Sequence, residues 1–196
     1  MFKRLEIGGS PVTEQPFRNL HAEDIAMAGS RRASSRREKI LSAGIFLYRL
    51  SPDGVRGMLA HPGGPYFAKK DLGAWTIPKG LVNPGEALSA AGRREFAEEV
   101  GWQPEGELLP IGDVILPSGK RVTGFALQTG ESEATVLERF APGTFTMPWP
   151  PRSGQRAEFP EVDRVEFFSI PEALLRINPA QVPFLERLLD LMAAQP

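Results

Sequence analysis

The segment from residue 80 to residue 102, GLVNPGEALSAAGRREFAEEVGW, contains a helix pattern with an unusual cluster of acidic residues. Glu95, Glu98 and Glu99 stand at i, i+3 and i+4, so they share one narrow face of the helix beside Arg94. Carboxylates on one face repel each other, and near the C-terminal end the helix dipole also disfavours them. The cluster becomes favourable when a divalent cation binds to it, because carboxylates converge on hard cations. The pattern therefore indicates a metal site.

The same segment contains the signals that bound this helix. Its spacing predicts a helix from about Leu88 to Val100, and Gly101 is the residue that ends it. Phe96 and Val100 then face the core, on the side opposite to the acids. A solvated, glutamate-rich helix face is the alternative interpretation, and it is the usual one for an isolated pair of glutamates.

Outside this helix, apolar runs and turn residues predict a layered domain. Strands are predicted over residues 43–50, 55–60, 108–116, 120–129 and 163–169, and helices over residues 133–140, from residue 171, and over 179–192. Residues 141–160 are rich in Pro and Gly and are predicted to form a loop. Strands interleaved with helices indicate one α/β domain with a mixed sheet.

The first 40 residues differ in charge from the rest of the chain. The length of 196 residues predicts a single domain with an extension, which we divide into an N-terminal extension over 1–40 and a domain over 41–196. The extension carries a net charge of +3 and the domain −4. No aromatic residue stands among the basic residues of 31–39, so we interpret the extension as a flexible, solvated tail. An arm that binds anions or nucleic acid is the alternative.

Composition excludes several kinds of chemistry. The chain has no cysteine and two histidines, which excludes disulfide scaffolds, thiolate nucleophiles and Cys-ligated zinc, and which is compatible with a cytoplasmic protein. Its 24 acidic residues leave oxygen ligands and hard cations, Mg²⁺ or Mn²⁺. A formal net charge of −1 does not favour nucleic acid as a partner. No apolar run approaches the roughly 18 residues that span a membrane, so no membrane partner is expected.

The segment over residues 80–102 resembles the signature of the Nudix hydrolases over its whole length. The matching positions are Gly80, Glu86, Arg94, Glu95, Glu98, Glu99 and Gly101, with Phe96 and Trp102 in the apolar slots. The resemblance extends less specifically from about Ser42 to Met192. It implies a Nudix-type α/β/α sandwich, and hydrolysis of a nucleoside diphosphate linked to another group with Mg²⁺ or Mn²⁺, whose charge stabilises the reacting phosphates.

The resemblance also implies a role for each matched residue. The implied metal ligands are Gly80, Glu86, Glu95, Glu98 and Glu99, and the implied catalytic residues are Glu95, Arg94 and Glu161. Glu98 and Glu99 are the principal ligands, and the backbone carbonyl of Gly80 is a further one. Glu95 is either a ligand or the base that activates water, and Arg94 orients it. Glu86 supports the site directly or through a metal-bound water.

Relatives often carry one more carboxylate on a loop before the last strand of the sheet, six residues before an aromatic residue. Glu161 stands six residues before Phe167 and is the first choice, and Glu158 is the second. This carboxylate would serve as a ligand or base. A solvated loop residue is the alternative for Glu161.

Basic and aromatic residues near the signature are candidates for substrate binding. The candidates are Lys79, Lys70, Lys69, Arg152 and Trp149, with Arg156 as a further loop cation. A cation in these places can contact substrate phosphate, and Trp149 can stack on a base. The alternatives are ordinary solvated side chains and, for Trp149, packing of the long loop.

The substrate is expected to be a small nucleotide. Two substrate classes stay open, together with a non-catalytic alternative. Residues 75–80, WTIPKG, resemble the approach to the signature in diadenosine polyphosphate and diphosphoinositol polyphosphate hydrolases, so a dinucleoside polyphosphate or nucleoside triphosphate is the first choice. Pro117, 15 residues beyond Trp102, keeps ADP-ribose and nucleotide sugars as an alternative, although it also suits a turn. A Nudix-fold sensor without catalysis is the other alternative, and the oligomeric state is left open.

Overall fold

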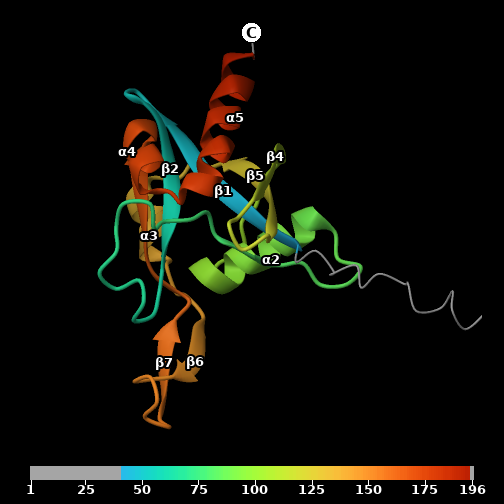
Figure 1. Ribbon diagram of the computed structural model, residues 1–196. Helices are drawn as coiled ribbons and strands as arrows, with labels where there is room; N and C mark the ends of the chain where they lie inside the picture. The colour runs from blue at the N-terminus through green and yellow to red at the C-terminus, as the bar shows by residue number, and fades with distance from the viewer. Residues whose placement is uncertain (1–40, 195–196) are drawn as a thin grey trace, which may run out of the picture. The chain divides into compact units, whose positions relative to one another are not determined.

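A mixed β-sheet forms the centre of the computed structural model, which describes residues 41–194 (Figure 1). Its strands are β1 (Leu41–Ser51), β2 (Gly54–Pro62), β3 (Lys79–Leu81), β4 (Leu108–Ile115), β5 (Arg121–Gln128) and β8 (Val162–Ser169). The order is β4-β5-β1-β2-β8, and β3 pairs with the start of β1. The β1–β5 pair is parallel and the other pairs are antiparallel, which confirms the prediction of a mixed sheet.

Helices cover both faces of this sheet. They are α2 (Leu88–Val100), α3 (Glu133–Glu138), α4 (Ile170–Arg176) and α5 (Val182–Ala193), with a 3₁₀ turn η2 (Pro179–Gln181) before α5. Alternate residues of β1 face opposite cores: Ile45 packs in the core that contains Phe96 of α2, and Phe46 in the core that contains Phe184 of α5. The α/β/α sandwich is therefore confirmed.

The acidic helix has the predicted bounds. Helix α2 runs from Leu88 to Val100 and buries Phe96 and Val100. Gly101 follows with φ of 98°, a left-handed conformation that closes the helix through a hydrogen bond from its N–H to the Ala97 carbonyl. A Cβ at Gly101 would also lie 2.4 Å from the Ala141 carbonyl oxygen. Two independent constraints thus require glycine here.

The prediction of a loop over residues 141–160 is wrong. This segment contains a hairpin of β6 (Thr144–Pro148) and β7 (Arg156–Pro160), which forms a separate two-stranded sheet and lies away from the main sheet in Figure 1. The prolines suggested a loop, but none of them lies inside a strand. Pro148 and Pro160 end β6 and β7, where a missing N–H is tolerated, and the others lie outside these strands. The three-residue strand β3 was too short for any periodicity, and the predicted terminal helix begins as the η2 turn.

The expected extension over 1–40 lies outside the residues that the structure describes, so its proposed flexibility and the role of its basic residues stay predictions. Within residues 41–194, none of the helices has the length and apolar character that a membrane crossing requires.

Candidate active site

A cleft of about 420 Å³ opens where the acidic helix meets β3 and the start of β5. It is lined by Gly63, Lys79, Gly80, Leu81, Glu95, Glu99, Lys120, Phe145 and Glu161. Five of these nine residues come from the segment around the acidic helix, namely Lys79, Gly80, Leu81, Glu95 and Glu99. The others arrive from four separate parts of the chain, so the cleft is a product of the tertiary fold.

Gly80 lies directly against the carboxylate of Glu95. A Cβ built at position 80 would be 1.6 Å from Glu95 Oε2, which is far inside any possible contact. Strand β3 is held in this place by its pairing with β1, in which Gly80 stands opposite Ala43. The glycine is therefore required by the approach of a side chain, and the signature position has a steric reason in this chain.

Arg94 connects three of the glutamates to one another. Its Nε and Nη2 donate to the two carboxylate oxygens of Glu86, both at 2.9 Å, in a bidentate pair. Its Nη1 donates to Glu95 at 2.6 Å and reaches Glu98 at 3.3 Å. Nη2 also donates to the Leu81 carbonyl at 2.7 Å, which joins the helix to the end of β3. The orienting role of Arg94 stays a prediction, and these hydrogen bonds are the contacts through which it would act.

These contacts change the titration of the groups involved. Hydrogen bonds from Arg94, and then from the Asn83 backbone N–H, lower the pKa of Glu86 to about 2. Hydrogen bonds to Glu86 and Glu95 raise the pKa of Arg94 above its usual range. Both groups therefore keep their charges near neutral pH.

Glu99 is a partly buried carboxylate of the cleft. Its Oε2 accepts a hydrogen bond of 2.8 Å from the Lys79 backbone N–H, which fixes it against β3. Burial raises the pKa of Glu99 to about 7, and the negative charges of Glu95 and Glu161 act in the same direction, against the favourable charge of Lys79. The cleft thus concentrates negative charge that a bound cation would neutralise.

Glu161 reaches the cleft through a chain of backbone hydrogen bonds. The Gly143 N–H donates to the Glu98 carbonyl at 2.9 Å, and the Glu161 N–H donates to the Gly143 carbonyl at 2.9 Å. The Gly63 N–H donates to the Glu161 carbonyl, also at 2.9 Å. Burial, followed by the charges of Glu95 and Glu98, raises the pKa of the Glu161 carboxyl. Glu158, the second choice, is exposed on β7, hydrogen-bonds to Thr144 and does not line the cleft.

Two lysines line the cleft together with the acids. Lys79 was a sequence candidate, whereas Lys120 was missed. Lys120 directly follows a tight turn in which the Gly119 N–H donates to the Leu116 carbonyl at 2.8 Å, and this turn places it where β5 starts beside β1. Burial and then the charge of Lys79 lower the pKa of Lys120. No local pattern distinguishes Lys120, because its place depends on the parallel pairing of distant strands.

The other substrate-binding candidates do not line the cleft, and these are Lys69, Lys70, Arg152 and Trp149. Lys70 Nζ lies 4.8 Å from the centre of the Phe67 ring, and its carbonyl contacts His61 Nε2 at 2.8 Å. Trp149 packs edge-on against Tyr66, with ring centres 5.5 Å apart. Arg152 lies in the connection between β6 and β7 with φ of 65°, and Arg156, also outside the cleft, donates from Nη2 to the Thr146 carbonyl.

The donor chemistry of the cleft fits a hard cation. Its charged acceptors are carboxylate oxygens, and in the described part of the chain no three Asp, Glu or His side chains already form a compact ligand cluster. Glu95 is engaged with Arg94, and Glu98 is 52% exposed beside the same guanidinium. Burial, followed by repulsion from neighbouring carboxylates, raises the pKa of Glu99 and Glu161, and a divalent cation would relieve that repulsion. The residues thus suit Mg²⁺ or Mn²⁺ by chemistry.

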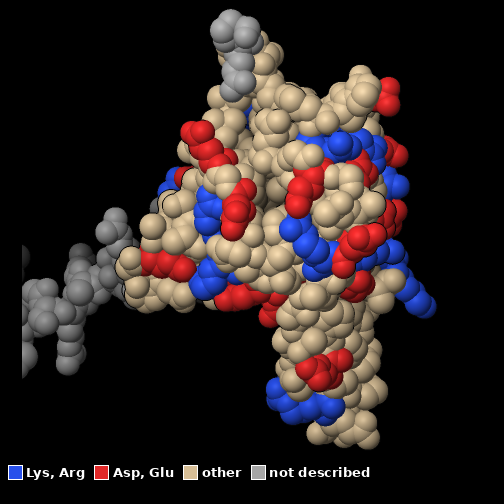
Figure 2. All heavy atoms as spheres, turned by 180° about the vertical axis from the view of Figure 1, so that it is seen from behind, with Lys and Arg blue, Asp and Glu red and all other residues tan. Residues whose placement is uncertain are grey.

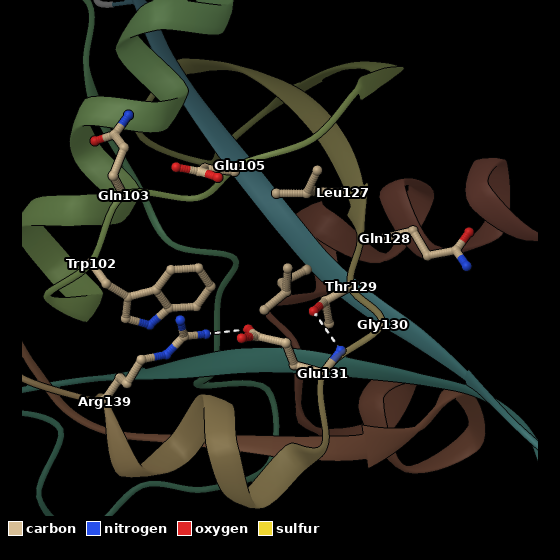
Figure 3. A pocket seen from close by; sticks show the side chains of 10 residues that line it. Trp102, Gln103, Glu105, Leu127, Gln128, Thr129, Gly130, Glu131 and Arg139 are labelled. Carbon is tan, nitrogen blue, oxygen red and sulfur yellow. Dashed lines mark hydrogen bonds and ion pairs between the residues drawn. The ribbon is translucent and has the colours of Figure 1, made fainter.

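A second cavity, of about 390 Å³, shares no lining residue with the cleft (Figure 3). Here the Arg139 guanidinium lies 4.2 Å from the centre of the Trp102 ring and forms an ion pair with Glu131. Gln103, Gln128 and Thr129 add uncharged polar groups. None of the residues predicted to act in metal or substrate binding lines this cavity, so we place the candidate active site in the cleft.

A mixed sheet between two helical layers, with a glutamate-bearing helix at a cleft, defines the class of protein as an α/β/α domain of the Nudix type. A family model for the NUDIX domain matches residues 55–188, so the chain belongs to the Nudix family. The prediction of a Nudix hydrolase is confirmed at the level of the family.

Curated relatives match only short stretches of this chain. An ADP-ribose pyrophosphatase, mitochondrial, of Rattus norvegicus is 58% identical over 31 residues, which cover 16% of this chain and 9% of that protein. An RNA pyrophosphohydrolase of Erythrobacter litoralis is 45% identical over 49 residues, which cover 22% of this chain and 30% of that protein. The matched part thus spans less than a third of either relative's length.

Among solved structures, a C. elegans Ap4A hydrolase in a binary complex shares the fold. The TM-score is 0.53 at 19% sequence identity, and the match covers 78% of this chain and 98% of that one. At this identity the likeness supports the architecture only.

We expect Arg94→Lys to lower kcat/KM by about tenfold, because lysine retains the charge but cannot bridge Glu86, Glu95 and the Leu81 carbonyl together. Steady-state kinetics on the best nucleotide substrate measure the effect. Arg93→Lys is the matched control, since Arg93 donates to the Pro104 and Gly106 carbonyls outside the cleft. Equal effects of both changes would contradict the orienting role of Arg94.

Proposed function

We propose that the protein hydrolyses a phosphoanhydride bond in a nucleoside diphosphate linked to another group, with Mg²⁺ or Mn²⁺, and that its substrate is a dinucleoside polyphosphate or a nucleoside triphosphate. The observation that supports this most is the pairing of acids and lysines in one cleft. Glu95, Glu99 and Glu161 provide anionic oxygens for cations, while Lys79 and Lys120 provide cationic groups for phosphate. The cleft therefore has groups that are complementary to the metal ions and groups that are complementary to the phosphates of a metal–polyphosphate complex.

In this proposal the residues of the signature hold the cations. Glu98 and Glu99, with the Gly80 carbonyl, are the principal ligands; Glu95 and Glu86 complete the set directly or through water. The cations, when bound, neutralise phosphate oxygens and lower the pKa of a coordinated water. Arg94 orients Glu86 and Glu95, as its hydrogen bonds indicate. Glu161, whose pKa is raised by burial and neighbouring acids, is suited to hold a proton at its carboxylate oxygen or to bind a cation.

The lysine pair favours a long phosphate chain. Lys79 and Lys120 alone match the two negative charges of a single diphosphate bridge, so together with the proposed divalent cations they provide positive charge for further phosphates. Each lysine contacts phosphate as a point charge. Pro117, which kept ADP-ribose open, lies in the tight turn before Lys120 and is accounted for by that turn. The complete set of signature carboxylates favours catalysis over a sensor role.

A substrate panel tests the proposal. The protein is incubated with Mg²⁺ or Mn²⁺ and with diadenosine polyphosphates, nucleoside triphosphates, ADP-ribose and a nucleotide sugar, and released phosphates are measured. We expect the highest kcat/KM for a substrate with three or more consecutive phosphates. A clear preference for ADP-ribose would replace this substrate class, and binding without turnover of any compound would support the sensor.

Removing Lys120 is expected to weaken binding of the phosphate chain. We expect Lys120→Ala to raise KM for the best polyphosphate substrate by about tenfold, because a charge-assisted contact inside a partly enclosed cleft is lost. Lys69→Ala is the matched comparison, since Lys69 is exposed and does not line the cleft. A larger effect of Lys69→Ala would contradict the assignment of Lys120.

A further inference from the structure

Four aromatic residues form a continuous row that leads away from the cleft. This aromatic row consists of Tyr66, Phe145, Trp149 and Phe159. Ring centres are 6.1 Å apart for Phe145 and Phe159, and 6.4 Å apart for Trp149 and Phe159. Tyr66 meets Trp149 edge-on at 5.5 Å and 82°. Three of the rings stand on the β6–β7 hairpin or at its end, and the fourth lies on the loop after β2.

The row belongs to neither hydrophobic core of the described domain. None of its members is among the residues that form those cores or pack against them. Because a two-stranded hairpin has little stability alone, contacts between Phe145 and Phe159 have a structural use. That use does not account for Tyr66, which leaves 59% of its surface exposed. The Tyr66 ring is thus exposed to solvent beside the half-buried ring of Trp149.

The row is continuous with the candidate active site. Phe145 lines the cleft, and Glu161 directly follows the last residue of β7. Gly63, also in the cleft wall, is three residues before Tyr66. Phe145 lies on β6, and Trp149, directly after this strand, is four positions further along, which is about 13 Å of extended chain. A group attached to a phosphate chain in the cleft is therefore within reach of the row.

The chemistry of the two regions is complementary. The cleft carries charged side chains of both signs, whereas the hairpin seen in Figure 2 is largely uncharged apart from one acidic and one basic patch towards its tip. Every nucleobase has a π face that stacks on aromatic side chains, with little dependence on its identity. An uncharged aromatic surface beside a phosphate-binding cleft matches the two ends of a nucleotide.

We propose that the aromatic row binds the nucleobase of the substrate, with Tyr66 and Trp149 as the stacking residues. This inference rests on the proposed function for the phosphate chain but concerns a different surface. It assigns a binding role to Tyr66 and to the hairpin. It also predicts that the enzyme selects polyphosphates that carry a nucleoside but discriminates little between bases, because stacking depends little on the identity of the base.

The test compares a substrate that has a base with an inhibitor that has none. Tyr66→Leu keeps an apolar side chain but removes the π face, and Tyr66→Phe keeps both. We expect Tyr66→Leu and Trp149→Leu to raise KM for diadenosine tetraphosphate by about tenfold. The inhibition constant of inorganic tripolyphosphate, which occupies only the cleft, should stay within about twofold of the parent value. Tyr66→Phe should resemble the parent, as should the control Leu175→Ala, whose side chain is 64% exposed on α4.

The outcomes separate this inference from the proposed activity. Unchanged KM in Tyr66→Leu, or equal weakening of nucleotide and tripolyphosphate, would overturn base binding while leaving hydrolysis intact. If the parent hydrolyses no compound of the panel, calorimetry with ATP decides: affinity that falls about tenfold in Tyr66→Leu supports the base site without the activity. Failure of the parent to bind ATP, or binding unaffected by Tyr66→Leu, would overturn it.

Discussion

Replacing Glu99 by glutamine is expected to lower kcat/KM by at least about 10²-fold, or roughly 2.7 kcal/mol of transition-state stabilisation. Glu99 lies within the cleft and is fixed against β3 by the Lys79 N–H, so its oxygens have a defined position. Glutamine preserves shape but removes the anionic charge that the proposed cation requires. Steady-state kinetics with Mg²⁺, together with Mn²⁺ affinity by electron paramagnetic resonance, measure the two parts of the effect.

Glu186→Gln is the matched control, because Glu186 is an exposed glutamate on α5. Thermal unfolding in EDTA shows whether the Glu99 variant folds. The pKa of Glu99 is raised to about 7, so the folded metal-free protein binds more protons than the unfolded chain, and its stability falls as pH rises from about 4.5 to about 7. Glutamine does not titrate, so the Glu99→Gln variant lacks this loss of stability. Above pH 7 in EDTA, the Tm of the variant should therefore not fall below that of the parent. Parent-like activity and Mn²⁺ affinity would refute the role of Glu99.

Adding one methyl group at Gly80 is expected to be almost as damaging. The Cβ of Gly80→Ala would stand 1.6 Å from Glu95 Oε2, so either this carboxylate or strand β3 must move by more than 1 Å. If Glu95 has the proposed role, a displacement of that size lowers rates by about 10²-fold, and overpacking costs about 1–3 kcal/mol of stability. Kinetics and denaturant unfolding measure the two effects.

Gly130→Ala is the control for this change. Gly130 has no atom within 4 Å of an added Cβ, so an alanine there meets open space. We expect its activity to match the parent. If Gly80→Ala kept full activity and stability, the close packing of Gly80 on Glu95 would not matter for the site.

Much of the fold followed from local patterns. The helix over Leu88–Val100 was predicted with its observed bounds, because a 3.6-residue period and a terminal glycine are properties of neighbouring residues. Five of the six strands of the main sheet were predicted to within two residues at each end. The β6–β7 hairpin was missed because its prolines imitate a loop, and its apolar residues pack against one another outside the two main cores.

In the candidate site, too, local patterns predicted the placement of some residues but not of others. Arg94, Glu95, Glu98 and Glu99 are placed together by helix geometry, so spacing alone was sufficient to group them. Lys69 and Lys70 were reasonable candidates because they precede the signature, yet the fold leaves them outside the cleft. For these loop lysines, proximity to the signature in the sequence did not predict proximity to the cleft in the fold.

The sequence by itself determined the acidic helix and, by its lack of cysteine, the exclusion of thiol chemistry, and it supplied the carboxylates from which a hard cation is proposed. Only the tertiary structure decided which residues from other parts of the chain line the cleft beside that helix. The parallel pairing of β1 with β5 brings Lys120 to the cleft, and the backbone bonds through Gly143 bring Glu161 there. The physical reason is that side-chain periodicity is set within a few residues, whereas a cleft depends on hydrogen bonds between segments that are far apart in the chain.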